Sequence, residues 1–232
     1  MELIVCRGIW TDPQRRSKMI VIVRLRSQEH KGKVCDYIES KLEDFQKSIE
    51  GKGRLLYLSE RAKHEDVSLF IHTLDSDILG DFIADHLSKI EDITGTWIIN
   101  MLKPQFYPLP KDTKNMKRFT ITLKVFPKNL KEIYLSLTSA TLTDELKLAY
   151  VAYTCHLFGD CIQFSILAEK EETLNKYLTE VVEKIPGVLK TTVSLIEKTK
   201  PLVSYDEWKK YSAKHGIVSS WDEESMINQF QQ

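Results

Sequence analysis

The sequence predicts an α+β protein made of two tandem βαββαβ modules of the ferredoxin-like kind, each with an antiparallel sheet. Three observations predict this fold. Apolar, β-branched runs alternate with segments whose apolar residues recur every three or four positions. The same order of runs and segments occurs twice along the 232 residues. A polar stretch that contains three prolines, at residues 103–117, separates the two occurrences.

The first half contains each element of one module in order. Residues 18–26 (KMIVIVRLR) form an apolar run that is typical of a strand. Apolar residues then recur with helical spacing through 32–49, which predicts one helix. Two glycines at positions 51 and 53 end that helix. The module is completed by strands at 54–59 and 67–74, a helix at 79–90 and a strand at 97–102.

The second half repeats this order. Strands are predicted at 119–126, 146–155, 161–167 and 191–196, with helices beginning at 130 and covering 174–185. The likeness extends to single residues, because the pairs Ile90 and Ile185, Ile98 and Val193 share one spacing along the chain. A fixed spacing between similar segments is typical of repeated structural units.

The strands predict how the modules pack. Two helices cover one face of a four-stranded antiparallel sheet, and the other face stays open. The strands carry apolar residues at nearly consecutive positions, whereas a sheet that faces water would alternate. We therefore expect the open faces to be buried against each other, sheet to sheet, as an α/β barrel. The sequence leaves open whether the modules pair within one chain or between two.

These elements divide the chain into four parts. We expect a first module at 18–103, a linker at 104–117, a second module at 118–199 and a C-terminal tail at 200–232. The tail begins with a capping box, Ser204 followed by Glu207, which predicts a short helix. Large apolar residues follow up to Phe230, and they predict that the tail docks on this chain or on a neighbour.

Composition limits the function classes. Lys+Arg and Asp+Glu both number 33, so the net charge is zero, which argues against a direct nucleic-acid partner. No apolar run approaches the length that spans a bilayer, and no signal peptide is evident, so we expect a cytoplasmic protein without a membrane partner. A near-zero net charge also leaves self-association unopposed, which allows a homo-oligomer.

The second half resembles a known family. The segment at 156–167 (HLFGDCIQFSIL) and the segment at 184–196 (KIPGVLKTTVSLI) are similar to the effector-binding, or RAM, domain of the Lrp/AsnC transcription regulators. The resemblance implies a dimeric α/β barrel that binds amino acids or related small molecules near its module interfaces. Members of the family carry a helix-turn-helix domain before this module. Only about 17 residues precede the first strand here, too few for three helices, so we expect no DNA-binding domain.

The motif at Gly159-Asp160 supplies the candidate site. A turn between strands would place backbone N–H groups and a carboxylate at a sheet edge, where they could hold an amino acid's carboxylate and ammonium groups. Glycine and aspartate also favour turns for conformational reasons alone. Tyr153 and His156 flank the motif and are expected to line the site. Either residue could equally be a packing or surface residue.

From these features we expect a sensing or regulatory module, not an enzyme, that binds an amino-acid-like metabolite and acts on a regulator protein or on its own copies. One alternative is a scaffold built on the same barrel without a ligand. The other is a dimeric-barrel enzyme, since such barrels host small oxygenases and haem enzymes. A haem enzyme would need a proximal histidine inside the barrel, with His72 and His156 as candidates.

Motifs for bound groups are missing from the sequence. No spacing matches a known zinc pattern, and no dinucleotide, phosphate-loop or hydrolase motif occurs. We therefore expect no metal, no cofactor and no catalytic residue.

Overall fold

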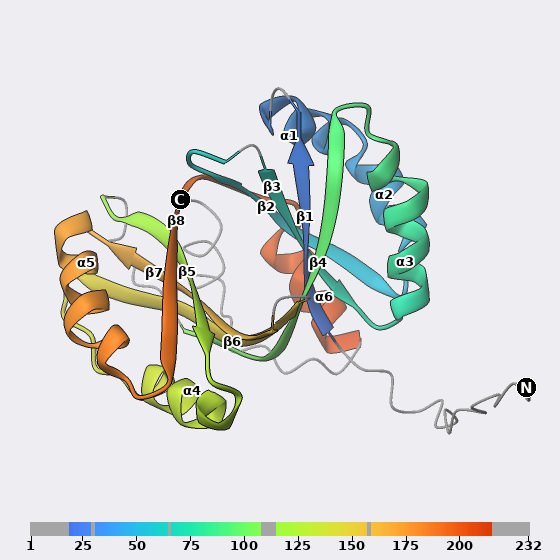
Figure 1. Cartoon of the computed structure of the whole chain (residues 1–232). Helices are drawn as coiled ribbons and strands as arrows, with labels where there is room; N and C mark the ends of the chain where they lie inside the picture. Colours follow the sequence, from blue (N-terminus) through green and yellow to red (C-terminus); the bar gives the residue numbers. More distant parts are fainter. Residues whose placement is uncertain (1–18, 29–30, 65, 108–114, 157–158, 215–232) are drawn as a thin grey trace, which may run out of the picture.

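A computed structural model describes residues 19–28, 31–64, 66–107, 115–156 and 159–214. Its strands form one closed barrel with the order β1-β3-β2-β8-β5-β7-β6-β4 (Figure 1). All neighbouring pairs are antiparallel. The strands are β1 (Met19–Ser27), β2 (Gly53–Arg61), β3 (Asp66–Thr73), β4 (Ile93–Phe106), β5 (Lys117–Val125), β6 (Leu146–His156), β7 (Gly159–Ala168) and β8 (Val188–Pro201).

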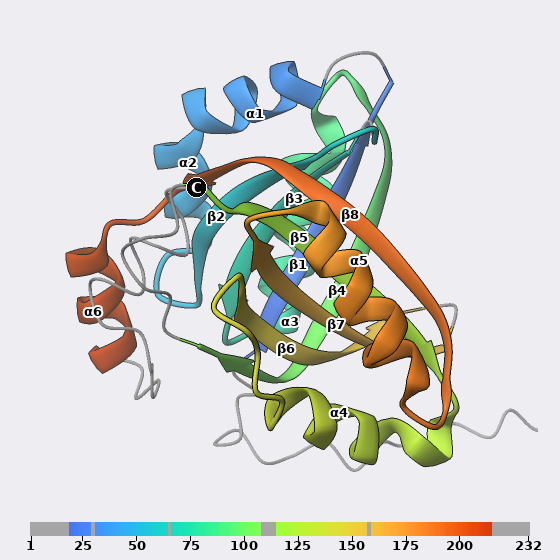
Figure 2. The ribbon, with the colours of Figure 1, turned by 90° about the vertical axis from the view of Figure 1, so that its left-hand side faces the viewer.

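The helices lie outside the barrel, so each half of the chain has its own helical layer (Figure 1). The first half contributes α1 (Lys31–Ser40), α2 (Leu42–Ser48), α3 (Ser76–Asp85) and the short η1 (Leu87–Lys89). The second contributes η2 (Pro127–Asn129), α4 (Leu130–Thr138), α5 (Glu171–Glu180) and η3 (Val182–Lys184). A last helix, α6 (Tyr205–Lys214), follows β8 and lies beside α2 and β2 (Figure 2).

The expected single helix at 32–49 is divided into α1 and α2 at Lys41. Hydrogen bonds continue across the division, because Lys41 N–H donates to the carbonyl of Tyr37 and Phe45 N–H donates to that of Lys41. The backbone of Lys41 is therefore a local distortion within one amphipathic stripe. Both parts bury that stripe, through Val34 and Ile38 in α1 and Phe45 in α2.

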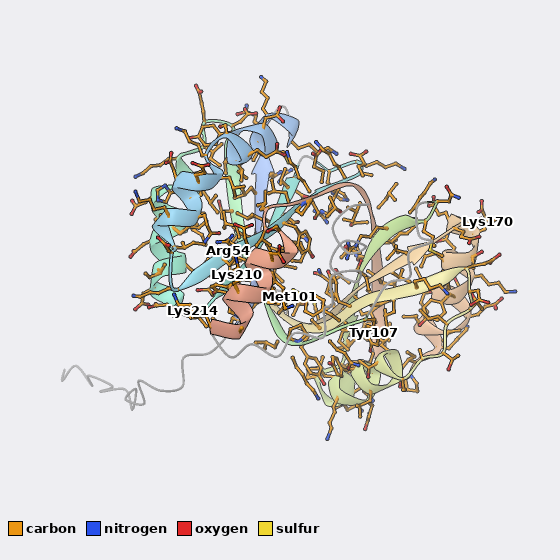
Figure 3. All side chains as sticks on the ribbon, turned by 180° about the vertical axis from the view of Figure 1, so that it is seen from behind. Arg54, Met101, Tyr107, Lys170, Lys210 and Lys214 are labelled. Carbon is orange, nitrogen blue, oxygen red and sulfur yellow. The ribbon has the colours of Figure 1, made fainter. Side chains whose placement is uncertain are left out.

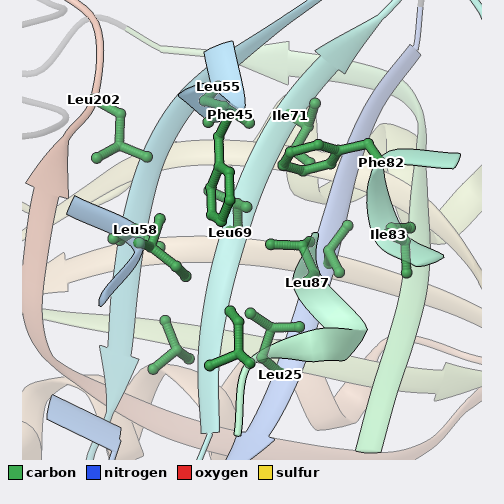
Figure 4. Close-up of a cluster of buried hydrophobic side chains, with 14 of the residues drawn as sticks. Leu25, Phe45, Leu55, Leu58, Leu69, Ile71, Phe82, Ile83, Leu87 and Leu202 are labelled. Carbon is green, nitrogen blue, oxygen red and sulfur yellow. The ribbon is translucent and has the colours of Figure 1, made fainter. Parts of the chain in front are cut away.

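The barrel explains why the strands are apolar on both faces. Alternate residues of β1, among them Val21, Val23 and Leu25, pack outward against the helices of the first half, whose outer core is shown in Figure 4. The residues between them, such as Ile22, point into the barrel, where an inner apolar cluster lies. A second outer core joins α4 and α5 to the other half. Both faces are thus buried, as the sequence predicts.

The two halves pair within one chain. Each contributes four strands, and the joints are the antiparallel pairs β2–β8 and β4–β6. The sheets therefore join at their edges into one barrel instead of stacking as two separate layers, and their open faces look at each other across the interior. The last three elements of each half also correspond in length: α3 with α5, η1 with η3, and β4 with β8.

β4 is longer than the predicted strand because a bulge carries it past a proline. Lys103 adopts a φ of 49°, and the register shifts between Leu102 and Gln105. Pro104 lacks an N–H group and is tolerated at such an irregularity. The strand therefore continues to Phe106, into the segment expected to be a linker.

The tail helix docks on the chain's own barrel. The predicted capping box forms, since Ser204 Oγ and its backbone N–H both donate to Glu207 Oε2 at 2.9 Å. Trp208 is 3% exposed and belongs to the inner apolar cluster. The apolar residues near Phe230 lie outside the described residues. Among the described helices, none is long and apolar enough to cross a membrane.

Candidate functional site

Three of the four residues predicted to bind a ligand lie where the backbone is described but the side chains are not. β6 ends at His156 and β7 begins at Gly159, and these two residues are partners in the ladder. Asp160 pairs with Cys155. Gly159 and Asp160 therefore belong to a strand, not to the turn in which the sequence placed them. A binding role for them stays a prediction.

Tyr153, the fourth residue, lies on the outer face of β6. Its ring stacks on that of Tyr134 in α4, with 4.4 Å between the ring centroids, and packs against the outer core of the second half. Burial raises the pKa of the Tyr153 hydroxyl. Tyr134 is itself held by a hydrogen bond from its hydroxyl to the carbonyl of Lys103 at 2.9 Å. Tyr153 is thus a packing residue between sheet and helix, separated by the sheet from the barrel interior.

Polar side chains gather inside the barrel instead. Outward residues on β1, β3 and β5 belong to the outer cores, so the residues between them point inward. On β2 the interior cluster includes Tyr57, and on β6 it includes Tyr150. The polar interior, as we define it, consists of Arg24, Tyr57, Arg61, Asp66, Arg118, Tyr150, Gln163, Ser165 and Ser194.

Arg118 and Tyr150 form the part of the polar interior that belongs to the second half. Arg118 Nε donates to Ser165 Oγ at 3.0 Å, and Gln163 Nε2 donates to the hydroxyl of Tyr150 at 2.6 Å. Burial raises the pKa of the Tyr150 hydroxyl, although this bond and the charge of Arg118 oppose the rise. Burial likewise raises the pKa of Tyr57, against the charge of Arg118. Both phenols therefore stay protonated near neutral pH.

Arg24, Arg61 and Asp66 form the part that belongs to the first half. Arg61 pairs with Asp66 through two hydrogen bonds and reaches Ser194 Oγ at 3.2 Å. Burial alone would raise the pKa of Asp66, but the hydrogen bonds and charge of Arg61 outweigh it and lower that pKa. Burial, followed by the charge of Arg61, lowers the pKa of Arg24 to about 10, so Arg24 is still a cation at neutral pH.

The polar interior carries excess positive charge. Among the residues that the structure describes, Asp66 is the only acidic residue less than one tenth exposed. Its charge is matched by Arg61, which leaves Arg24 without an acidic partner of its own among the described residues. Buried charges are costly unless they are paired or hydrogen-bonded. This excess therefore suits an interior that receives a negatively charged molecule or a negatively charged state of a reacting one.

The end of the barrel near the start of β1 is closed by α6. His72 is 2% exposed, and its Nδ1 lies 3.0 Å from the hydroxyl of Tyr211. The rings of Trp208 and Tyr211 meet the His72 ring edge-on, with centroids 6.1 and 5.5 Å away. Arg54 of β2 holds the same helix through Glu207 at 2.7 Å, beside Lys210 in Figure 3.

This packing tests the haem alternative. A proximal histidine needs one ring nitrogen that faces an open space large enough for a macrocycle. At His72 that space is filled by side chains of α6, so His72 does not fit the role. The His156 side chain lies outside the described residues. Within the described chain, no group of three His, Cys, Asp or Glu side chains is arranged to hold a metal ion.

Solved structures share the barrel fold. The chain is similar to a candidate monooxygenase from Lactobacillus acidophilus NCFM, with a TM-score of 0.51, 12% identity, and coverage of 77% of this chain and 92% of that one. It is also similar to an anthrone oxidase-like protein, with a TM-score of 0.52, 10% identity, and coverage of 80% and 94%. A mutant chlorite dismutase from Candidatus Nitrospira defluvii follows at a TM-score of 0.49, 8% identity, and coverage of 77% and 91%.

No protein-family model and no curated protein sequence matches the chain. At these identities, the structural likeness shows a shared fold.

These comparisons correct three expectations. The resemblance to the Lrp/AsnC effector-binding domain is wrong, because the similar structures are barrels of a candidate monooxygenase and an anthrone oxidase-like protein. The short motifs that carried it are turn and strand-end segments that any βαββαβ module can contain. The same structures contradict the expected sensing or regulatory function. They also contradict the expectation that the chain is not an enzyme, since these structures bear the names of enzymes.

Sequence reasoning missed the polar interior. Arg24 stands inside the run IVIVRLR, and Gln163 inside CIQFSIL. A long polar side chain within an otherwise apolar strand is a usable signal, because burying it is costly without a partner. Yet the direction of such a side chain depends on the register, which these strands leave open since they are apolar on both faces.

Proposed function

We propose that this protein is an oxygen-using enzyme of the monooxygenase-like barrel kind, which oxidises a small organic molecule inside the barrel. The guanidinium groups buried in the polar interior carry the proposal. The shared fold with an anthrone oxidase-like protein and a candidate monooxygenase supports it.

The reaction that suits this interior begins with an acidic C–H or O–H bond in the substrate. The proton leaves, and the electron pair of the resulting anion passes to molecular oxygen, which forms a C–O bond and a hydroperoxide. Loss of water from that hydroperoxide breaks the O–O bond and leaves a carbonyl group. The balance is R₂CH₂ + O₂ → R₂C=O + H₂O, so the substrate supplies all four electrons and no external reductant is needed.

The guanidinium groups favour the first step. A unit charge about 5 Å from the developing anion, at an effective dielectric of about 20, stabilises it by about 3 kcal/mol. That is a decrease of about 2 units in the pKa of the substrate. Arg118 is suited to this role because Ser165 fixes its guanidinium at Nε beside Tyr150. Tyr150 stays protonated, and we propose that its hydroxyl donates a hydrogen bond to the substrate anion.

Oxygen uptake tests the proposal. The purified protein is mixed with anthrone and with a set of phenols and enolisable ketones, and dissolved oxygen is followed with an electrode. We expect one oxygen molecule consumed per carbonyl formed with at least one member of the set, faster than the uncatalysed rate. Isotopic ¹⁸O₂ should label the new carbonyl. An uptake that never exceeds the protein-free rate would overturn the proposal.

Two variants of one residue separate charge from packing. Arg118→Met removes the charge but keeps most of the apolar stem, and Arg118→Lys keeps the charge. We expect Arg118→Met to lower the rate about 10-fold to 100-fold, since single electrostatic donors contribute on this scale or more. The lysine variant should retain more activity. Equal rates in wild type and Arg118→Met would exclude a catalytic contribution from this charge.

We also propose that the halves, bounded as the sequence predicts at 18–103 and 118–199, are tandem copies of one module. The support is the equal spacing of α3, η1 and β4 against α5, η3 and β8. In this view one chain supplies both sheets of the barrel. A monomer by sedimentation equilibrium that still shows the proposed activity would agree with it.

A further inference from the structure

Arg24 differs from the other two guanidinium groups of the polar interior because its Nε lacks a hydrogen-bond acceptor among the described residues. Arg61 is bound by Asp66, and Arg118 by Ser165. The Nε of Arg24 is shielded from solvent and has no hydrogen-bond acceptor in the part of the chain that the structure describes. Its nearest charges are those of Arg61, which repels it, and Asp66, which already pairs with Arg61.

Such a group destabilises the folded chain. A buried donor without an acceptor costs about 1–3 kcal/mol, and more when the group is charged. Arg24 lies opposite Ser68 and Trp97 in the neighbouring strands, and the fold requires only a side chain that fits between them. A neutral residue would serve the fold better. The side chain of Arg24 is therefore best explained by an acceptor that comes with a ligand.

Trp97 supplies a second, independent observation beside Arg24. It stands opposite Arg24 in the β1–β4 ladder, on the inward-facing register of β4 that it shares with Ile99 and Met101. Although it belongs to this face, its side chain is 40% exposed. The interior is thus open near Trp97, toward the end of β1 opposite to the one that α6 covers.

Gly95 allows the Trp97 ring to lie where it does. A Cβ atom at Gly95 would come within 3.1 Å of the ring. The ring therefore lies over the Gly95 backbone along β4. Since Trp97 and Arg24 are partners in the β1–β4 ladder, an aromatic residue and a cation are neighbours at the open end of the barrel.

We propose that Arg24 and Trp97 form a substrate subsite for a planar aromatic molecule with one carboxylate, the carboxylate bound by Arg24 and the ring packed on the indole of Trp97. This inference rests on the proposed function and specifies its substrate class. Bidentate carboxylate binding matches the donor fork of a guanidinium. The single guanidinium of this subsite matches one negative charge, which favours a monoanion over a phosphate or a polyanion.

Binding of 2-naphthoate tests the subsite. Affinity is measured by isothermal titration calorimetry for the full-length chain, with 2-naphthamide as the neutral analogue and acetate as the anion without a ring. We expect 2-naphthoate to bind at least about 10-fold more tightly than either analogue. Equal affinity for 2-naphthoate and 2-naphthamide would overturn the role of the charge, and equal affinity for acetate would overturn the role of the ring.

Arg24→Gln is the decisive variant, with Lys176→Gln as its control. Lys176 is exposed on α5, outside the barrel, so this variant removes the same charge from the surface. We expect Arg24→Gln to weaken 2-naphthoate at least about 10-fold, and Lys176→Gln less than twofold. Equal weakening by both variants would mean general attraction and would overturn the proposal.

Thermal stability separates binding from structure. Since the Nε of Arg24 has no acceptor among the described residues, Arg24→Gln should melt no lower than Lys176→Gln. A large fall in the melting temperature would instead assign Arg24 a structural role and overturn the subsite. Trp97→Leu should weaken 2-naphthoate while leaving acetate unchanged, and an unchanged affinity for 2-naphthoate would exclude the indole from the subsite.

The failure of the two proposals can be told apart. If 2-naphthoate binds in the expected manner but no substrate consumes oxygen, the subsite stands and the oxidation fails. If phenols or ketones consume oxygen but Arg24→Gln binds 2-naphthoate as tightly as wild type does, the oxidation stands and the subsite fails.

Discussion

Docking of α6 over the barrel end stabilises the folded chain through the buried side chain of Trp208. Trp208 is 3% exposed and lies among the inner apolar cluster, which includes Tyr57 and Phe70. Truncation of a buried tryptophan to alanine costs about 3–5 kcal/mol through lost burial and the cavity that remains. In a domain of this length each kcal/mol lowers the midpoint by about 2–4 °C. Trp208→Ala should therefore melt about 6–20 °C below wild type.

The assay is thermal and urea unfolding followed by circular dichroism, with Lys210→Ala as the control. Lys210 is exposed on the same helix, so its loss should change the free energy of unfolding by less than about 0.5 kcal/mol. A cost below about 1 kcal/mol for Trp208→Ala would refute the reasoning, because it would mean that α6 does not seal this end of the barrel in solution.

Three further predictions concern the barrel and its polar interior. Tyr150→Phe should cost about 1–3 kcal/mol, because Gln163 is 3% exposed and would lose its acceptor, and adding Gln163→Leu should restore part of this loss in urea unfolding. In the folded chain the pKa of Asp66 is below its usual 3.8, so its carboxylate stabilises the fold above pH 3.8, and this stabilisation is lost as the pH falls through the lowered pKa. The free energy of unfolding of Asp66→Asn should therefore fall less steeply with acid than that of wild type. Gly187→Ala should destabilise the fold far more than Gly51→Ala. Both glycines have positive φ, but a Cβ atom at Gly187 would meet Asn129 at 2.5 Å, whereas one at Gly51 would meet open space. Similar melting temperatures for the two variants would contradict this reasoning.

The elements of the fold could be predicted from the sequence because each depends on a local pattern. The run at 18–26 is β-branched, and the stripe through Val34, Ile38 and Phe45 has helical spacing, so period alone identifies both. Apolar residues on both strand faces also predicted a covered interior. The length of β4 could not be predicted, since Lys103-Pro104 is typical of a loop and only the bulge carries the strand past it.

The site could not be predicted, for a physical reason. Glycine and aspartate at 159 and 160 are conspicuous in the sequence because both residue types favour turns, yet both belong to β7, and their binding role stays a prediction. Arg24 and Arg118, by contrast, resemble ordinary charges near strand ends in the sequence. Only the register shows that both point into the barrel, and the register depends on pairing with strands far away in the chain.

A crystal structure grown without oxygen, in the presence of an aromatic carboxylate that the protein oxidises, tests the central claim most directly. We predict that the molecule lies inside the barrel, with its carboxylate on the guanidinium of Arg24, its ring on Trp97 and its reacting carbon toward Arg118 and Tyr150. A molecule bound outside the barrel, between the sheet and α4 near Tyr153 or in the cleft between α2 and α6, would contradict the account.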